Sequence, residues 1–144
     1  MEKLDQILFF ALEKSIKTYR QFAQRQIDKA GIDITIDQWL VLKSILDWPD
    51  ISQHQLAENV FKDYASVTRM IELLVKKEYL TRAFHSTDRR RFNLIITKKG
   101  NSVLDKVIPI IAANRKQALK SLTKEEIENN KAFLNQIIEN CKSD

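Results

Sequence analysis

The feature that most constrains the fold is a helical apolar stripe followed by two short strand-like runs. The stripe begins after Lys62 and has the i, i+3, i+4 spacing of one helix face. Its members are Val67, Met70, Ile71, Leu74 and Val75. Residues 80–84 and the β-branched run 92–97 follow, and the polar segment 85–91 between them is typical of a loop. This stretch therefore predicts an amphipathic helix that leads into a β-hairpin.

The face opposite the stripe and the hairpin loop are polar and basic. The helix face carries Ala65, Arg69, Glu72 and Lys76, flanked by Ser66 and Thr68. The loop contains the run 88–91, Asp-Arg-Arg-Arg. A helix of this size fits a major groove, and a basic tip can reach the phosphates or the minor groove beside it. We therefore expect this segment to bind double-stranded DNA.

The positive charge of the chain is concentrated in the same segment. Residues 60–100 hold 10 Lys and Arg against 4 Asp and Glu, whereas the other residues hold 14 against 15. The net charge of +5 at pH 7 therefore originates here. A surface that binds a polyanion is the simplest physical reason for this asymmetry. A solvated basic surface without a partner is the alternative.

Length and composition restrict the class of protein. A chain of 144 residues with 44% hydrophobic and 30% charged residues is typical of one soluble globular domain. With only 2 Gly and 2 Pro, helices should dominate. The apolar run 7–12 is far shorter than the roughly 20 residues of a membrane span, and no signal peptide is recognisable. The single Cys141 cannot form an internal disulfide, so we expect a cytoplasmic protein.

Capping boxes predict three helix starts. Thr35, Ser52 and Thr123 are each followed three residues later by Gln or Glu, and each has apolar neighbours at the staple positions. The first of these helices should end near Asp47, before Trp-Pro-Asp, and the second near Asn59. A short helix and a turn thus precede the amphipathic helix, which is a helix-turn-helix layout with the hairpin as its wing.

Long helices are predicted at both ends of the chain. Residues 1–30 keep helical spacing, and Gly31 fits the position just past the helix end. The start of this helix is apolar over more than half of its circumference, which favours an interface with a second chain over an ordinary buried helix. Residues 98–119, with Pro109 inside, and residues 123–141 are the other two predicted helices.

These segments resemble the MarR (multiple-antibiotic-resistance regulator) family of bacterial winged-helix repressors. The likeness runs nearly end to end and is strongest in ASVTRMIELLVKKEYLTR, DRRRFNLIITKKG, TIDQWLVLKSI and ISQHQLAENV. Its most specific part is Asp88-x-Arg90 followed by Leu94-x-x-Thr97-x-x-Gly100. The resemblance implies a single, mainly α domain with a β-hairpin wing. The winged helix-turn-helix would span about 35–100, between dimerisation helices at about 1–30 and 101–144.

The resemblance also implies a function and a set of contacts. Such a protein is a homodimeric transcriptional regulator, a repressor on a pseudo-palindromic operator, with release by a small ligand as a further expectation. Arg90 would enter the minor groove, oriented by Asp88, and Arg69 would lie in the major groove unless it pairs with Glu72. Gln53 lies where a phosphate can approach. The predicted DNA-binding residues are Gln53, Ala65, Ser66, Thr68, Arg69, Lys76, Asp88, Arg89, Arg90 and Arg91.

Two positions depart from the family pattern. Glu78 stands where the family usually has Gly after the reading helix, and a left-handed conformation there would cost ~1 kcal/mol. Leu73 stands where a charged residue is common, and it can pack on the wing instead of facing water.

Some relatives bind small aromatic acids in a cleft between the dimer helices and the reading domain. Tyr19, Phe22, Trp39 and Met70 are the residues that could line such a cleft, and plain core packing is the alternative for them. No cofactor or metal is expected, because the two His residues and Cys141 form no cluster with ligand spacing. We expect Cys141 to be a solvent-exposed thiol.

Two other classes of protein compete with a DNA-binding regulator. A winged-helix module for protein–protein interaction would share the fold, but the basic segment argues against it. An enzyme would need a nucleophile–base pair, paired carboxylates in an apolar setting or a Gly-rich phosphate loop, and the sequence contains none of these.

Overall fold

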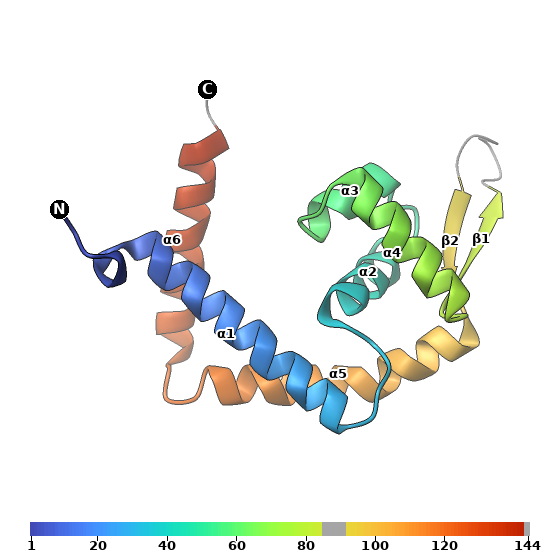
Figure 1. The fold of residues 1–144 in the computed structure, drawn as a ribbon, viewed down its shortest axis with the longest axis horizontal. Helices are drawn as coiled ribbons and strands as arrows, with labels where there is room; N and C mark the ends of the chain where they lie inside the picture. The colour runs from blue at the N-terminus through green and yellow to red at the C-terminus, as the bar shows by residue number, and fades with distance from the viewer. Residues whose placement is uncertain (85–91, 143–144) are drawn as a thin grey trace. The chain divides into compact units, whose positions relative to one another are not determined.

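The computed structural model describes residues 1–84 and 92–142 and confirms the predicted fold, a mainly helical chain with a two-stranded hairpin (Figure 1). Its elements are the 3₁₀ turn η1 (Leu4–Gln6), α1 (Leu8–Lys29), α2 (Ile36–Asp47), α3 (Gln53–Asn59), α4 (Tyr64–Lys76), β1 (Leu80–Phe84), β2 (Phe92–Ile96), α5 (Lys98–Ala118) and α6 (Lys124–Lys142). The chain divides into two compact units, 1–114 and 115–144, and each is described by itself. Within the described residues, no helix is both long and apolar enough to cross a membrane.

The three predicted capping boxes are confirmed. In each box the hydroxyl accepts a hydrogen bond from the amide three residues on, and the longer side chain accepts one from the cap amide. The pairs are Thr35–Gln38, Ser52–Gln55 and Thr123–Glu126, with N···O distances of 3.1–3.2 Å. Each hydroxyl cap stabilises its helix by ~1 kcal/mol. Local sequence chemistry therefore sets three of the helix boundaries.

The first predicted helix was wrong at its start. Residues 1–30 do not form one helix, because Ile7 is extended, with φ −83° and ψ 125°, between η1 and α1. The side chain of Gln6 accepts from the amide of Lys3 at 2.9 Å and closes the first turn on its own. The apolar spacing continues across this break, so periodicity could not detect it. The helix end was predicted correctly, since Gly31 follows it with φ +71°.

The hydrophobic core of the first unit is formed by every helix from α1 to α5 and by β1. Its fully buried side chains include Ile27, Leu42, Leu56, Val67, Ile71, Leu74, Leu80, Leu104 and Val107. Each such side chain stabilises the fold by roughly 1.5–3 kcal/mol. The side-chain amide of Asn114 on α5 also donates to the carbonyl of Ala23 on α1 at 3.4 Å. The core therefore packs against the apolar face of α4 and leaves the opposite, polar face exposed to solvent.

The wing begins at a left-handed residue. Glu78 has φ +66°, as the missing family glycine suggested, and this costs ~1 kcal/mol. β1 and β2 then pair antiparallel, with Leu80 opposite Ile96. Leu73 of α4 is 44% exposed.

The wing is joined to α5 by a tight connection. Thr97 alone separates β2 from α5; its amide donates to Tyr79 O at 3.0 Å and its hydroxyl to Glu78 O at 2.5 Å. Gly100 is buried in the first turn of α5, where a Cβ atom would lie 2.3 Å from Tyr79 O. Only glycine allows this close approach between the helix and the wing.

Several large apolar side chains remain exposed on the terminal helices. In the first unit these are Leu8, Phe9 and Ile16 of α1, between 47% and 56% exposed. In the second unit they are Phe133, Leu134 and Ile138 of α6, between 40% and 50% exposed. Exposed apolar faces of this kind mark surfaces that bind a partner.

Candidate nucleic-acid interface

The predicted reading residues lie on the outer side of α4. Val67, Ile71 and Leu74 are buried, whereas Arg69 and Lys76 are exposed. The whole predicted set on this helix is exposed or half-buried: Ala65, Ser66, Thr68, Arg69 and Lys76. The stripe in the sequence therefore identified the faces of α4 correctly. Contact of these side chains with DNA remains a prediction.

The start of α4 is held by an aspartate cap that the sequence patterns did not single out. The carboxylate of Asp63 accepts from the amide of Ser66 at 2.7 Å, and Arg69 donates to the hydroxyl of Ser66 at 3.1 Å. The backbone and side-chain hydrogen bonds from Ser66 lower the pKa of Asp63, and the charge of Arg69 adds to this. The residue three positions after the cap is Ser rather than Glu or Gln, which hid the cap from a capping-box search.

Arg69 is directed along its own helix. It bonds to Ser66 and forms no ion pair with Glu72 among the described residues, so the structure does not adopt the alternative pairing. Its guanidinium has further donors that are not used by Ser66, and these suit a phosphate or a guanine edge.

The first turns of α3 and α4 are joined side by side. The amide of Gln53 donates to the hydroxyl of Thr68 at 2.5 Å, and that hydroxyl donates to Tyr64 O at 3.0 Å. The rings of His54 and Tyr64 are in contact, with centroids 4.5 Å apart. Two predicted DNA-binding residues, Gln53 and Thr68, are thus brought together by the fold. Their side chains are hydrogen-bonded to each other and half-buried where the two helices meet.

Charged contacts tie the turn before α4 to α1. Asp37, near the start of α2, forms a close ion pair with Arg20 of α1 and lies 3.7 Å from the ammonium of Lys62 in the α3–α4 turn. Asp37 is 28% exposed, so each pair contributes no more than about 1 kcal/mol. These ion pairs therefore position the turn before α4 relative to α1 and α2, and they add little to the stability of the fold. They join residues distant in sequence, and no local pattern predicts them.

The far end of α4 is anchored in the same way. The ammonium of Lys77 lies 2.9 Å from the carboxylate of Asp33 and donates to Gln38 at 3.1 Å. The hydroxyl of Tyr79 donates to Asp33 O at 2.8 Å. Burial, and then the charge of Asp33, raises the pKa of Tyr79, so the phenol stays protonated and remains a donor. The residues that flank α4 on both sides therefore contact residues 33–38, which lead into α2 and form its first turn.

Comparisons with known proteins identify this arrangement. The model of the MarR family matches residues 34–92, which contain α2, α3, α4 and β1. MhqR, an HTH-type transcriptional regulator of Bacillus subtilis, is 28% identical over 121 residues, 84% of this chain and 82% of MhqR. This chain belongs to the MarR family. As a MarR-family transcriptional regulator it is a DNA-binding protein and not an enzyme.

Two solved structures share the fold of this MarR-family chain. MepR of S. aureus, solved as a DNA complex, has a TM-score of 0.83 at 19% identity and matches 95% of this chain and 98% of its own. BpsR of Bordetella bronchiseptica, whose DNA binding is regulated by 6-hydroxynicotinic acid, has a TM-score of 0.82 at 18% identity. That match covers 100% of this chain and 99% of BpsR. The likeness in fold to these two regulators therefore covers nearly the whole chain.

The wing motif lies outside the described residues. Asp88, Arg89, Arg90 and Arg91 belong to the segment 85–91, so their predicted contacts stay predictions. In the described part of the hairpin, Arg82 on β1 is an exposed cation on the strand that leads toward this segment. Arg82 was not among the predicted contacts, because it is a single cation within a strand-like run, whereas the basic run lies in the loop.

The four residues predicted to line a ligand cleft have different environments. Trp39 belongs to the core and Met70 packs against it, whereas Tyr19 and Phe22 are half-buried on α1. Their ligand role stays a prediction. Cys141 is an exposed free thiol. Among the residues that the structure describes, no group of His, Cys, Asp and Glu could hold a metal ion.

Proposed function

We propose that this MarR-family regulator is a homodimeric repressor that inserts one α4 helix per subunit into the major groove of a pseudo-palindromic operator. The observation that carries the proposal is the outer face of α4. This face carries exposed Arg69 and Lys76, and Thr68 at its edge is hydrogen-bonded to Gln53 of α3. The segment 60–100 that contains α4 is also the source of the net positive charge of the chain. Two such faces related by twofold symmetry read half-sites about one helical turn apart.

The terminal helices support the dimer. The exposed apolar side chains of α1, Leu8, Phe9 and Ile16, form a face without cover in the single chain. Those of α6, Phe133, Leu134 and Ile138, do the same in the second unit. A second copy of the chain is the simplest partner for both faces, because homodimers with twofold symmetry are the commonest oligomers.

The contacts divide into two groups. Arg69 and Gln53 would contact base edges or phosphates in the major groove, and Arg90 would reach the minor groove from the wing. Ala65 and Ser66 lie where close approach of the helix requires small side chains. Lys76, in the last turn of α4, would contact phosphate and contribute affinity without sequence information.

A small aromatic ligand would release the operator. BpsR, which shares the fold, is regulated by 6-hydroxynicotinic acid, and this supports the expectation of an effector. Tyr19 and Phe22 on α1 are its candidate contacts, because they are half-buried rather than enclosed in the core.

The test combines selection and sizing. Selection of bound duplexes from random DNA should yield an inverted repeat, and sedimentation should give the mass of two chains per duplex. The affinity should fall steeply with salt, since each neutralised phosphate releases counterions. A selected site without twofold symmetry, or one chain per duplex, would overturn the dimeric part of the proposal. Salt-independent binding would overturn the DNA-binding part and favour a protein–protein interaction module.

A further inference from the structure

The residues that lead into α2, here called the connector (33–38), are held by one face of α1. The side-chain amide of Gln24 donates to Ile34 O at 3.2 Å and accepts from the backbone amide two residues further on, at 3.0 Å. Arg20 lies one turn earlier on the same face of α1 and forms an ion pair with Asp37. α1 therefore contacts both the backbone and a side chain of the connector.

The same connector contacts both flanks of α4. The ammonium of Lys62, before the helix, lies 3.7 Å from Asp37, and that of Lys77, after the helix, lies 2.9 Å from Asp33. The side chain of Lys77 is only 20% exposed, and its ammonium also donates to buried Gln38. Direct contacts thus run from α1 through the connector to each end of α4.

Apolar packing attaches α1 to the rest of its unit over a short length only. Of its 22 residues, Ala23 and Ile27 are buried in the single chain, and the amide of Asn114 donates to Ala23 O from α5. No side chain from 8 to 22 is buried. Because the apolar attachment is so short, the polar contacts with the connector have a large share in setting the angle between α1 and α4.

In a dimer joined through α1, that angle sets where the two α4 helices stand relative to each other. One additional base pair between two half-sites moves one of them by about 3.4 Å and rotates it by roughly 34° around the DNA axis. Two helices held at a fixed angle cannot follow both changes.

We propose that Asp37 and Gln24 determine which half-site spacing the regulator accepts, by holding α4 at one angle to α1. The inference rests on the homodimer proposed above. Both are positioning residues: they act through the connector, and a carboxylate such as that of Asp37 is repelled by the phosphates of DNA.

The first experiment uses the full chain and duplexes that differ only in spacing. The probes are the inverted repeat that the wild type selects from random DNA, the same repeat with one base pair added or removed between its half-sites, and a duplex with a single half-site. The altered spacing should weaken wild-type binding roughly tenfold or more in fluorescence anisotropy at fixed salt, because avidity is lost when both half-sites cannot be engaged together. In Asp37→Ala the loss should be about threefold or less, with affinity for the single half-site unchanged.

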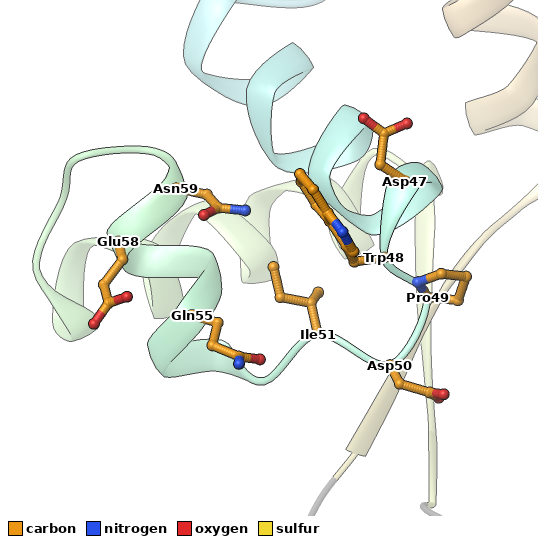
Figure 2. A pocket seen from close by; sticks show the side chains of 8 residues that line it. All are labelled: Asp47, Trp48, Pro49, Asp50, Ile51, Gln55, Glu58 and Asn59. Carbon is orange, nitrogen blue, oxygen red and sulfur yellow. The ribbon is translucent and has the colours of Figure 1, made fainter. Parts of the chain in front are cut away.

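Asp47→Ala is the matched control, because it also removes one carboxylate that pairs with a cation. Asp47 ends α2 and lies 2.6 Å from Lys43 of the same helix, so the pair that it loses lies within one helix. Figure 2 shows Asp47 at the edge of a hollow of about 560 Å³ between the end of α2 and α3, which Trp48 and Ile51 help to line, with its carboxylate directed away from α3. The control should keep the wild-type spacing preference.

A second measurement detects the geometry without DNA. A nitroxide label on Glu72→Cys, at an exposed position of α4, in a Cys141→Ser background gives one label per subunit. Pulsed electron–electron double resonance then measures the distance between the two labels of a dimer. Asp37→Ala should broaden the distribution of this distance, and Asp47→Ala should leave it as in the parent protein.

The outcomes separate this inference from the function on which it rests. An unchanged spacing preference in Asp37→Ala, or equal effects of Asp37→Ala and Asp47→Ala, would overturn the inference and leave the repressor intact. A loss at the single half-site as large as that at the full repeat would place the effect within one subunit and also overturn it. If the wild type shows no label–label distance and selects no inverted repeat, the homodimer itself is wrong. Gln24→Ala should widen the accepted spacing as Asp37→Ala does; circular dichroism checks both folds, and Asp37→Ala decides if Gln24→Ala does not fold.

Discussion

Gln53 and Thr68 share a hydrogen bond of 2.5 Å that joins the first residue of α3 to the outer face of α4. The hydroxyl of Thr68 accepts this bond and gives its own hydrogen to Tyr64 O. Its hydrogen-bonding capacity is therefore largely used inside the protein. Thr68 positions Gln53, and the amide oxygen of Gln53 bonds to no described residue, so under the proposed function it is the atom of this pair that contacts DNA.

Replacing Thr68 by Val should weaken operator binding about fivefold. Valine keeps the shape but removes the acceptor, which is worth ~1 kcal/mol as a hydrogen bond. Fluorescence anisotropy at fixed salt measures the effect. Because Thr68 acts through Gln53, the double variant Thr68→Val with Gln53→Ala should bind no more weakly than Gln53→Ala alone. Additive losses would mean that Thr68 contacts DNA directly.

Removing the cation of Arg69 should weaken binding roughly tenfold in Arg69→Ala, since a charged contact with DNA is worth about 1–3 kcal/mol. Arg90→Ala should have a similar effect if the wing enters the minor groove. Lys131→Ala is the control, because Lys131 lies on α6 in an exposed pair with Glu128. For each contacted phosphate, the slope of log affinity against log salt should fall by about 1. Equal effects in all three variants would contradict the assigned interface.

Gly100→Ala should destabilise the protein by about 1–3 kcal/mol, because the new methyl group has no room beside Tyr79 O and Ile96. Urea unfolding followed by circular dichroism measures the change. Gly31→Ala is the matched control: it has φ +71° but nothing within 4 Å of a Cβ. The control should lose only ~1 kcal/mol from backbone strain. A larger loss at Gly31 than at Gly100 would show that the wing can move away from α5.

Glu78→Gly should stabilise the protein by up to ~1 kcal/mol, since glycine adopts φ +66° without strain. The variant loses a weak contact with Lys99 at 3.9 Å, between exposed side chains, which offsets little. Glu72→Gly in the middle of α4 is the control for the direction of the stability change, because glycine at that position should destabilise the protein by about 1 kcal/mol. Thermal unfolding that changes in the same direction in both variants would refute the strain at Glu78.

The Asp63 cap of α4 should make the free energy of unfolding depend on pH in acidic solution. The folded pKa of Asp63 is lowered from 3.8, first by the amide of Ser66. Its ionised cap therefore stabilises the fold above pH 3.8, and the stabilisation is lost as the pH falls through the lower folded value. Asp63→Asn keeps a capping oxygen but does not titrate. The difference in unfolding free energy between the two proteins should be constant near neutral pH and shrink in acid; a constant difference at all pH values would contradict this.

Sequence patterns predicted the parts of the fold that local chemistry controls. Thr35, Ser52 and Thr123 each carry the whole capping signal within four residues, and the structure confirmed all three. The extended Ile7 left the apolar spacing intact, so its break was invisible. The Asp63 cap used a serine partner and did not match the pattern sought.

Contacts between residues that are distant in the chain could not be predicted from local sequence patterns. Lys77 and Asp33 are 44 residues apart, and their contact follows from how α4 packs near α2. Trp48 looked like part of a helix break, because only the assembled fold places α3 beside it and forms the hollow. The polar face of α4 was predictable, but which of its side chains support others was not.

The wing is connected to α5 by Thr97 alone, without a flexible linker. Both the amide and the hydroxyl of Thr97 are bonded to the strand entrance at residues 78–79, and Gly100 presses the first turn of α5 against the same point. The wing and the start of α5 are therefore joined through residues 78–79 as well as through the chain itself. Each strand of the wing has five residues and is therefore roughly 17 Å long. If α5 tilts by a few degrees and the wing follows it, the strand ends that face the loop are displaced by about 1 Å.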